Sequence, residues 1–458
     1  MFDDAQSVLA AIPVDVLEVL DALERSGYPA YLVGGCVRDI LLGGDVADWD
    51  IASAATPDDV ADVFSGQRLL DTGSGFGTMT LLSQTQPQWT MEITTFRVDG
   101  VYSDGRRPDS IDFSTNIEDD LARRDFTINA MAYSPTRGLI DLFGGRLDLS
   151  SMVLRAVGDA SSRLQEDALR IMRALRFAAT LGLDIDKKLS EALHVNKGLL
   201  LNISAERIQA ELMRLLVARG EWLLPVLLEY GDVLAVPIPE IADMIGFDQF
   251  SPWHSYDVWE HTVHALAASS PDDPIVRLAL LLHDIGKPVT FKLDENGRGH
   301  FYAHAPEGGK MAKERLKALR FDNRTVDSTS ELISAHFAPV TPETILKWLR
   351  RLGEVQLGRL FEVKRGDLLA HAEHAVQEGL PKLQACIEAM DKALADDACY
   401  SLAQMAVDGD DLKAIGIEPG RRTGETLEAL LDAIVEEGLP NQRDILLSKA
   451  SQLVGHIE

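Results

Sequence analysis

The pattern of hydrophobic and polar positions changes near residue 160, from mixed helix and strand signals to an almost unbroken helical periodicity. Apolar spacing predicts an amphipathic helix over 10–25, followed by a short apolar strand at 30–33. Alternating or β-rich runs then predict strands over 48–53, 78–82 and 88–96. The first third of the chain is therefore predicted to be a small α/β domain.

The rest of the chain is predicted to consist of three helical blocks. Its 458 residues suffice for about three domains, and nine of the eleven histidines fall in the middle block. We expect a multidomain α+β fold class, with a small N-terminal α/β head followed by an all-helical neck, body and tail. The predicted ranges are 1–155 for the head, 156–235 for the neck, 236–375 for the body and 376–458 for the tail.

Composition and charge exclude several classes of protein. Hydrophobic residues at 46% and charged residues at 25% argue against a disordered or fibrous chain. The 44 basic and 72 acidic residues give a net charge of −28. This charge argues against a protein that binds nucleic acid or a membrane over its whole surface, but it does not exclude a local basic groove. Three cysteines are too few for a disulfide framework. Because the chain has no long apolar run and no signal-peptide pattern, we expect a cytoplasmic protein.

The first candidate site begins at a glycine turn after the strand at 30–33. Gly34 and Gly35 would let the backbone approach a ligand closely, and the start of the next helix offers free N–H groups to phosphate. Arg38, in the first turn of that helix, could add a positive charge. A tight strand-to-helix turn without a ligand explains the glycines equally well.

A pair of aspartates follows the glycine turn. Residues two apart on a strand face the same side, so Asp48 and Asp50 could converge on a divalent cation while Trp49 and Ile51 point into the core. Glu92 could add a third carboxylate from a neighbouring strand, or it could be an exposed strand position. A solvated acidic face is the alternative for an isolated pair, but the nearby glycines and arginine favour a site.

Further motifs come in the order known from one family. The chain resembles the class II tRNA nucleotidyltransferases, the family of CCA-adding enzymes and bacterial poly(A) polymerases. The motifs that carry the resemblance are GGCVRD with LGG and DWD (34–50), RRDFTINA (123–130), DLFGG (141–145), LRAVG (154–158), EDALR (166–170) and SAERIQAE (204–211).

The resemblance implies that a nucleotide is joined to the 3′ end of tRNA with release of pyrophosphate. Asp48 and Asp50 would be the catalytic residues that hold Mg²⁺. The expected partners are tRNA, CTP and ATP, with no membrane and no obligate protein partner. Nucleotide-binding roles would fall to Gly35, Arg38 and Arg124 at the triphosphate, and to Asp125 and Asn129 at the ribose 2′-hydroxyl. For Asn129, a helix-end hydrogen bond is an equal alternative.

The EDALR segment is predicted to lie on one helix. Ser162 and Gln165 are expected to form its capping box, with Asp167 and Arg170 on the face opposite an apolar one. From spacing alone, an i,i+3 ion pair is the favoured explanation of the last two. The resemblance implies instead that they read the base: Asp167 accepts from the amino group of cytosine or adenine, and Arg170 donates to the ring nitrogen. Arg173 and Arg176 would add stacking or phosphate contacts, or face solvent or tRNA.

Two further segments concern which nucleotides are added. Residues 96–108 resemble the flexible loop that CCA-adding and A-adding members carry and CC-adding members lack. Residues 71–78 resemble the CCA type rather than the poly(A) polymerase type. We therefore expect CCA addition, with an A-adding enzyme or a poly(A) polymerase as the alternative.

The histidine-rich block resembles an HD domain, a helical metal-dependent phosphohydrolase. The resemblance implies a site for Mn²⁺, Ni²⁺, Mg²⁺ or Fe²⁺, and His304 and His336 fall where such domains can recruit further ligands. An HD phosphohydrolase whose head only binds RNA is the alternative function from a different class. A non-catalytic RNA-binding protein is a weaker alternative, because it would not need two sets of metal ligands. The expected metal ligands are His261, His283, Asp284 and Asp367.

The last segment, 407–420, resembles the family's tRNA-elbow-binding tail but reads Pro419-Gly420-Arg421 instead of PGP. The neck, at 160–235, holds ten basic and ten acidic residues and is thus locally neutral in an acidic chain. We expect it to carry the RNA, with weak and strongly salt-sensitive binding.

Overall fold

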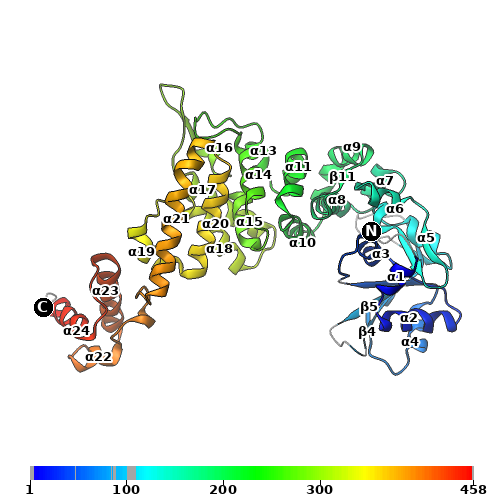
Figure 1. Cartoon of the computed structure of the whole chain (residues 1–458), viewed down its shortest axis with the longest axis horizontal. Coiled ribbons are helices and arrows are strands. Elements are labelled where there is room, and N and C mark those ends of the chain that lie inside the picture. Colours follow the sequence, from blue (N-terminus) through cyan, green and yellow to red (C-terminus); the bar gives the residue numbers. More distant parts are fainter. Residues whose placement is uncertain (1–4, 47, 84, 86–88, 101–109, 456–458) are drawn as a thin grey trace. The chain divides into compact units, whose positions relative to one another are not determined.

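The computed structural model describes residues 5–46, 48–83, 85, 89–100 and 110–455. Two compact units divide the chain, Met1–Pro239 and Glu240–Glu458. The first unit contains a mixed sheet followed by helices, and the second is mainly helical (Figure 1). The α+β fold class predicted from the sequence is confirmed, while the four domain ranges remain a prediction.

The head is built on a seven-stranded sheet in the order β3-β4-β5-β2-β1-β8-β9. Strands β2 and β5 run parallel, and the other neighbouring pairs of this sheet are antiparallel. Three strands predicted from the sequence form within a residue or two of their expected ends, and the strand at 30–33 matches. The strands are β1 Ala30–Val33, β2 Trp49–Ser53, β3 Leu69–Gly73, β4 Thr78–Leu82, β5 Thr90–Thr95, β8 Met131–Ser134 and β9 Gly138–Asp141, with a separate pair β6 Arg97–Asp99 and β7 Ile111–Phe113.

The described part of the head also contains six α-helices. Helix α5 packs against one face of the sheet through an apolar cluster that includes Tyr31, Phe96 and Leu121. The helix expected over 10–25 begins only at Val14, because Pro13 is held in an extended conformation and residues before a proline avoid helical geometry. The helices are α1 Ala5–Ala10, α2 Val14–Arg25, α3 Gly35–Leu42, α4 Pro57–Val63, α5 Ile117–Ala122 and α6 Gly145–Ser150.

The neck is helical, with one short strand pair between β10 Val153–Leu154 and β11 Asp184–Ile185. Helix α8 is its central element: it packs against α10 and α11, and nine of its residues are buried. The helices are α7 Ala160–Glu166, α8 Leu169–Leu181, α9 Lys187–Asn196, α10 Ala205–Leu216, α11 Gly220–Glu229 and α12 Gly231–Leu234.

The second unit contains the body helices, a hairpin and the tail. The hairpin, β12 Phe291–Leu293 and β13 Gly299–Phe301, interrupts the predicted helical block at Asn296-Gly297, where Gly297 has φ +76° and Asp294 accepts two backbone N–H bonds. The body helices are α13 Glu240–Met244, α14 Val258–Ala268, α15 Pro274–Leu282, α16 Lys287–Thr290, α17 His304–Ala318, α18 Asn323–Ala335, α19 Ile345–Leu352, α20 Glu354–Leu369 and α21 Glu373–Ala395.

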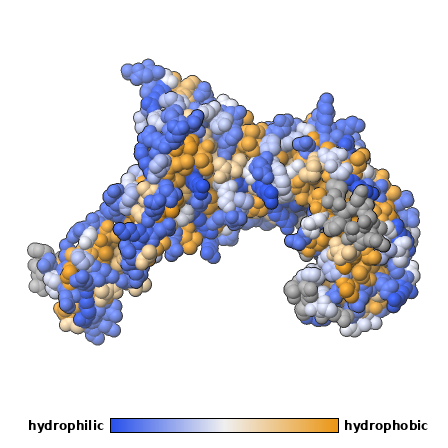
Figure 2. Space-filling view, viewed as in Figure 1, coloured by the Kyte–Doolittle hydropathy of each residue, from blue (hydrophilic) through white to orange (hydrophobic). Residues whose placement is uncertain are grey.

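The tail has its own apolar core. Leu412, Leu430, Leu431 and Leu446 are among the residues that fill it. On the face shown in Figure 2, hydrophilic residues predominate over the tail helices. No helix of the described residues is both long enough and apolar enough to cross a membrane. The tail helices are α22 Gly409–Ala414, α23 Arg421–Glu437 and α24 Arg443–Gly455.

Candidate functional sites

A carboxylate cluster lies at the start of strand β2. Asp50 is directly opposite Glu92 in the parallel pairing of β2 with β5, and the exposed Asp48 immediately precedes the strand. On the other face of β2, Trp49 and Ile51 are buried, as predicted from the alternation. The structure therefore brings Glu92, the optional third carboxylate, beside Asp50.

Electrostatics at this cluster favour a cation. Burial raises the pKa of Asp50 to about 6; Arg124 opposes the rise, while the charges of Glu92 and Asp48 add to it. Carboxylates that crowd one another in this way are stabilised when a positive ion lies between them. Oxygen ligands are those that Mg²⁺ prefers, so the residues present fit a magnesium ion.

The glycine turn places backbone and arginines beside the carboxylates. Gly34 has φ +75°, a backbone conformation that favours glycine, and a Cβ added there would displace the end of the Arg124 side chain, whose Nη1 would lie 2.7 Å away. Arg124 donates from Nη2 to Asp120 Oδ2 at 2.9 Å. Gly35 begins helix α3, which carries Arg38 one turn later.

A chain of hydrogen bonds joins the head to helix α8 of the neck. Arg38 Nη1 donates to Asn129 Oδ1 at 2.7 Å, Asn129 Nδ2 donates to Asp125 Oδ1 at 3.1 Å, and Arg173 Nη2 donates to Asp125 Oδ2 at 2.5 Å. Burial opposes ionisation of Asp125, but Arg173 outweighs it and lowers the pKa of that carboxyl to about 2. The Asn129 side chain thus bridges two other candidates, Arg38 and Asp125.

The EDALR segment differs from its prediction. Helix α7 ends at Glu166, Asp167 is extended with φ −135° and ψ 102°, and α8 begins at Leu169. The predicted single helix is wrong because the Asp167 carboxylate accepts the backbone N–H of Leu169 at 3.0 Å, which favours a new helix start there. The capping box is also wrong: Asp159 is the N-cap of α7, and its side chain accepts the N–H of Ser162.

The two base-reading candidates have separate partners, so the i,i+3 ion pair considered for them does not form. Asp167 Oδ2 accepts from Arg207 Nη2 of helix α10 at 2.9 Å. Arg170 is buried; it donates from Nη1 to Glu166 Oε2 at 2.7 Å and from Nη2 to the carbonyl of Arg123. Arg207 belongs to the SAERIQAE motif, but sequence spacing alone gave no reason to join it to Asp167.

Arg176, the remaining candidate on α8, is not a solvent-facing charge. Its Nε donates to Glu211 Oε2 at 2.6 Å, and its side chain is only 14% exposed. Glu211 is itself buried, on helix α10. The ion pair therefore ties α8 to α10 beside the candidate base-reading residues.

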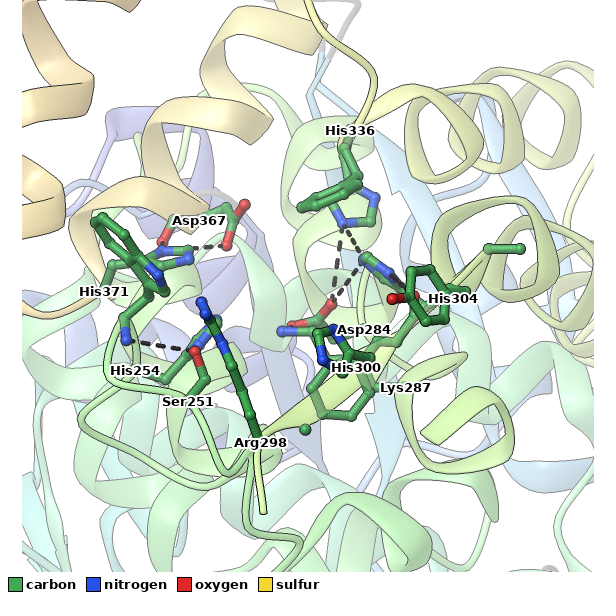
Figure 3. Close-up of a pocket in the computed structure, with 16 residues that line it drawn as sticks. Ser251, His254, Asp284, Lys287, Arg298, His300, His304, His336, Asp367 and His371 are labelled. Carbon is green, nitrogen blue, oxygen red and sulfur yellow. Dashed lines mark hydrogen bonds and ion pairs between the residues drawn. The ribbon is translucent and has the colours of Figure 1, made fainter. Parts of the chain in front are cut away.

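A second candidate site lies in the body, where α14, α15 and α20 pack against one another. Figure 3 shows the pocket at this site, with Asp284, His304 and His336 among the side chains around it. His261 Nε2 is 2.9 Å from Asp367 Oδ1, and His283 Nε2 is 3.1 Å from Asp284 Oδ2. The four HD ligands predicted from the sequence therefore come together. Among the described residues, three sets could each hold a metal ion here: His254, His261 and His371; His261, His283 and Asp367; and Asp284, His304 and His336.

Hydrogen bonding prepares these histidines for metal binding. The Nδ1 atoms of His283, His304 and His336 lie 2.7–2.8 Å from the backbone carbonyls of Leu280, Phe301 and Ile333. A carbonyl only accepts, so each Nδ1 carries a proton, and Nε2 is the ring nitrogen left to bind a metal in place of a second proton. This arrangement supports the idea that His304 and His336 are further ligands.

The charges and the buried polar atoms of the histidine cluster also favour a bound cation. His283 Nε2 and both carboxylate oxygens of Asp284 are buried without a hydrogen bond among the described residues. Burial alone would lower the pKa of His283, but the negative charges of Asp284 and Asp367 raise it to about 10. The interior of this site therefore stabilises positive charge, and its mixed nitrogen and oxygen donors suit a first-row divalent metal.

The pocket around these ligands has a volume of about 430 Å³. Sequence reasoning gave no role to Lys287, His254 or His371, which also line it. Lys287 Nζ lies 2.6 Å from Asp284 Oδ2, and His371 lies one helical turn beyond Asp367. The contact between Lys287 and Asp284 could have been predicted from their spacing of three residues, which places both side chains on the same side of a helical turn.

Three segments of the chain match families of known domains. The chain matches the family models described as "Poly A polymerase head domain" over residues 30–155, "Probable RNA and SrmB- binding site of polymerase A" over 182–244 and "HD domain" over 253–399. Fold and site thus define a nucleotidyltransferase head and neck, joined in one chain to an HD domain.

Relatives that match over nearly the whole chain identify the family more closely. A CCA-adding enzyme of Lactiplantibacillus plantarum is 30% identical over 94% of both chains, and one of Geobacillus thermodenitrificans is 31% identical over 93% of this chain and 94% of the relative. The crystal structure of the Bacillus stearothermophilus CCA-adding enzyme in complex with CTP has a TM-score of 0.71 at 27% identity, covering 96% and 97% of the two chains. The chain belongs to the family of CCA-adding enzymes, which are metal-dependent nucleotidyltransferases.

Proposed function

We propose that this protein adds CCA to the 3′ end of tRNA, without a nucleic-acid template, from CTP and ATP and with release of pyrophosphate. The observation that carries the proposal is the cluster of Asp48, Asp50 and Glu92 at the start of β2, beside an arginine network. The names of full-length relatives support the same activity. These substrates are consistent with a cytoplasmic location.

Asp48 and Asp50 would hold Mg²⁺, with Glu92 adjacent. When bound, the ion lowers the pKa of the attacking 3′-hydroxyl and neutralises charge on the α-phosphate and leaving group. Arg38 and Arg124 would bind the triphosphate, and the backbone of Gly35, at the start of helix α3, would approach it.

Base choice would depend on Asp167 and Arg170. Cytosine and adenine both present an amino donor beside a ring acceptor, whereas guanine and uracil present the reverse order and would leave both side chains unpaired. Asp167 has one carboxylate oxygen bound to Arg207 and the other to a backbone N–H. Arg170 donates to Glu166 and to two backbone carbonyls through its Nη atoms, and its remaining N–H groups would donate to the base.

The test compares matched variants in a tRNA extension assay with CTP, ATP and Mg²⁺. Asp50→Ala is expected to lower the extension rate by at least 10³-fold, since it removes a metal ligand from the reaction. Asp284→Ala, in the second unit, is the control and should extend tRNA at the wild-type rate. If Asp50→Ala keeps its activity, the carboxylate cluster is not the site. The alternative of an A-adding enzyme or poly(A) polymerase uses the same residues, and most of the loop that distinguishes them, at 101–109, lies outside the described residues.

A second activity is favoured by the histidine cluster. We propose that the HD site binds a divalent metal ion, among Mn²⁺, Ni²⁺, Mg²⁺ and Fe²⁺, and hydrolyses phosphate esters. Its support is the set of histidine Nε2 atoms that lie within 4 Å of Asp284, whose two buried carboxylate oxygens have no hydrogen bond among the described residues. Lys287 at Asp284 would balance charge and place a cation near a bound phosphate.

Metal content and hydrolysis test this second activity together. Wild-type protein should retain close to one or two ions per chain after gel filtration and hydrolyse bis(p-nitrophenyl) phosphate. Asp284→Ala should lose both properties, whereas Asp327→Ala, at an exposed ion pair with Lys313 in the same unit, should keep them. Metal retained without hydrolysis would restrict the site to a structural role.

A further inference from the structure

The aromatic ring of Phe177, on helix α8, lies among three arginine side chains. The guanidinium carbons of Arg38, Arg173 and Arg176 are 5.1, 5.2 and 3.9 Å from its centroid. Phe177 is only 5% exposed. Each of these distances is within the range in which a cation is attracted to the electron-rich face of a ring.

The three arginines come from two parts of the first unit. Arg38 belongs to helix α3 of the head, whereas Arg173 and Arg176 belong to the same neck helix as Phe177. Like charges gathered around one ring repel each other, and each guanidinium is paired with a carboxylate. The pairs are Arg38 with Asp39, Arg173 with Asp125 and Arg176 with Glu211.

Hydrogen-bond donors remain for a ligand. Arg173 uses Nε and Nη2 on Asp125, and Arg176 uses only Nε on Glu211. Within the described part of the chain, Nη1 of Arg173 and both Nη atoms of Arg176 have no hydrogen-bond acceptor. A polyphosphate offers several acceptor oxygens in a row, and planar guanidinium groups bind such oxygens in pairs.

The Phe177 ring is held in place by a second aromatic side chain. Phe126 meets Phe177 edge to face, with centroids 5.8 Å apart and planes at 81°. Phe126 is buried and follows Asp125 directly, so the same segment holds both the ring and the partner of Arg173. Phe177 therefore has little freedom to turn away from the guanidinium groups.

We propose that Phe177 is a positioning residue for the nucleotide triphosphate, whose ring holds Arg38, Arg173 and Arg176 at the spacing that the phosphates require. The inference rests on the proposed nucleotidyl transfer. Phe177 touches no reacting atom; it acts by ordering the cations of head and neck before the nucleotide arrives, which lowers the conformational cost of binding. It also accounts for an aromatic residue where an aliphatic one would fill the same space.

The test replaces the ring but keeps an apolar side chain. Phe177→Leu is expected to raise KM for both CTP and ATP by about fivefold to twentyfold, a size consistent with losing two or three cation–ring contacts. The kcat should change less than threefold. Phe177→Tyr keeps the ring and should restore KM to within about twofold of wild type. Phe126→Leu removes the ring that supports Phe177 but leaves Phe177 itself in place, so it should lower Tm and raise KM less than Phe177→Leu does.

Inhibition by inorganic triphosphate separates this role from a purely structural one. If the ring orders the phosphate cations, Phe177→Leu should weaken triphosphate inhibition by the same factor as it raises KM. Equal KM and equal inhibition in Phe177→Leu and wild type, with wild type extending tRNA normally, would overturn the inference alone. A wild-type protein that extends no tRNA would instead overturn the proposed function on which it rests.

Discussion

At the scale of residues, buried charges in the first unit are held by specific partners. Asp125 is the clearest case, because its carboxylate is buried and its two oxygens accept from Asn129 and Arg173. Replacing one member of such a pair leaves the other charge without a partner, which costs more than the pair contributes. Substitutions at these candidates therefore affect stability and nucleotide binding together, and both must be measured.

The first prediction concerns pH. Because the pKa of Asp125 is lowered to about 2 in the folded state, its contribution to stability is present above the unfolded value near 4 and is lost as pH falls through about 2. Asp125→Asn should lower the free energy of unfolding by roughly 2–3 kcal/mol at pH 7, and the difference should shrink below pH 4. Urea titrations at pH 7 and pH 3 measure it.

A matched control is Asp21→Asn, at an exposed ion pair with Arg25. It should change stability by less than about 0.5 kcal/mol at both pH values. A stability difference for Asp125→Asn that stays constant between pH 7 and pH 3 would show that the Arg173 pairing is not its origin.

At the scale of elements, the break between α7 and α8 determines where the base-reading candidates lie. Asp167 leaves the helix and is held by α10 through Arg207, while Arg170 is buried in the first turn of α8. A long-range pair of this kind depends on the packing of α8 against α10. Base selection is therefore expected to depend on α10 as well as on the EDALR segment.

The second prediction follows from this contact. Arg207→Ala should release Asp167 and raise incorporation of UTP and GTP relative to CTP by about tenfold or more, because the carboxylate is no longer held in one position. Single-nucleotide incorporation with each NTP measures it. Arg214→Ala, on the same helix with a side chain 66% exposed, is the control and should leave selectivity unchanged. Unchanged selectivity in Arg207→Ala would mean that the Arg207 contact does not govern base choice.

Local sequence patterns predicted the helices and strands better than they predicted helix breaks and the contacts between helices. Alternation identified strand β2 and the inward positions of Trp49 and Ile51, because both depend only on near neighbours in sequence. The helix break at Asp167 was missed because a side chain competing for a backbone N–H leaves no trace in apolar periodicity. The partners Arg207 and Glu211 could not be assigned for a similar reason, since they depend on how α8 packs against α10.

At the scale of the whole molecule, the candidate Mg²⁺-binding carboxylates and the histidine cluster lie in two separate compact units. The sequence showed both sets of ligands, because each contains closely spaced residues such as Asp48 and Asp50 or His283 and Asp284. The chain as a whole carries a charge of −28, while the proposed RNA-binding neck is locally neutral. Binding of tRNA must therefore depend on local arginines and lysines rather than on net charge.

The third prediction is a salt dependence of tRNA binding. Each phosphate neutralised by a basic side chain releases counterions, so affinity should fall at least tenfold between 50 and 200 mM KCl. Filter binding or fluorescence anisotropy measures it with a transcript that lacks CCA. Affinity that stays constant over this range would contradict a phosphate-based contact.

The most direct test of the central claim measures product length at single-nucleotide resolution. Transcripts ending at the discriminator base, at C or at CC are incubated with Mg²⁺ and with CTP, ATP or both. CCA synthesis predicts three, two and one added nucleotides, respectively, when both nucleotides are present, with extension stopping at CCA. A single A added only to the CC-ended transcript, long A tails, or no extension at all would each contradict it.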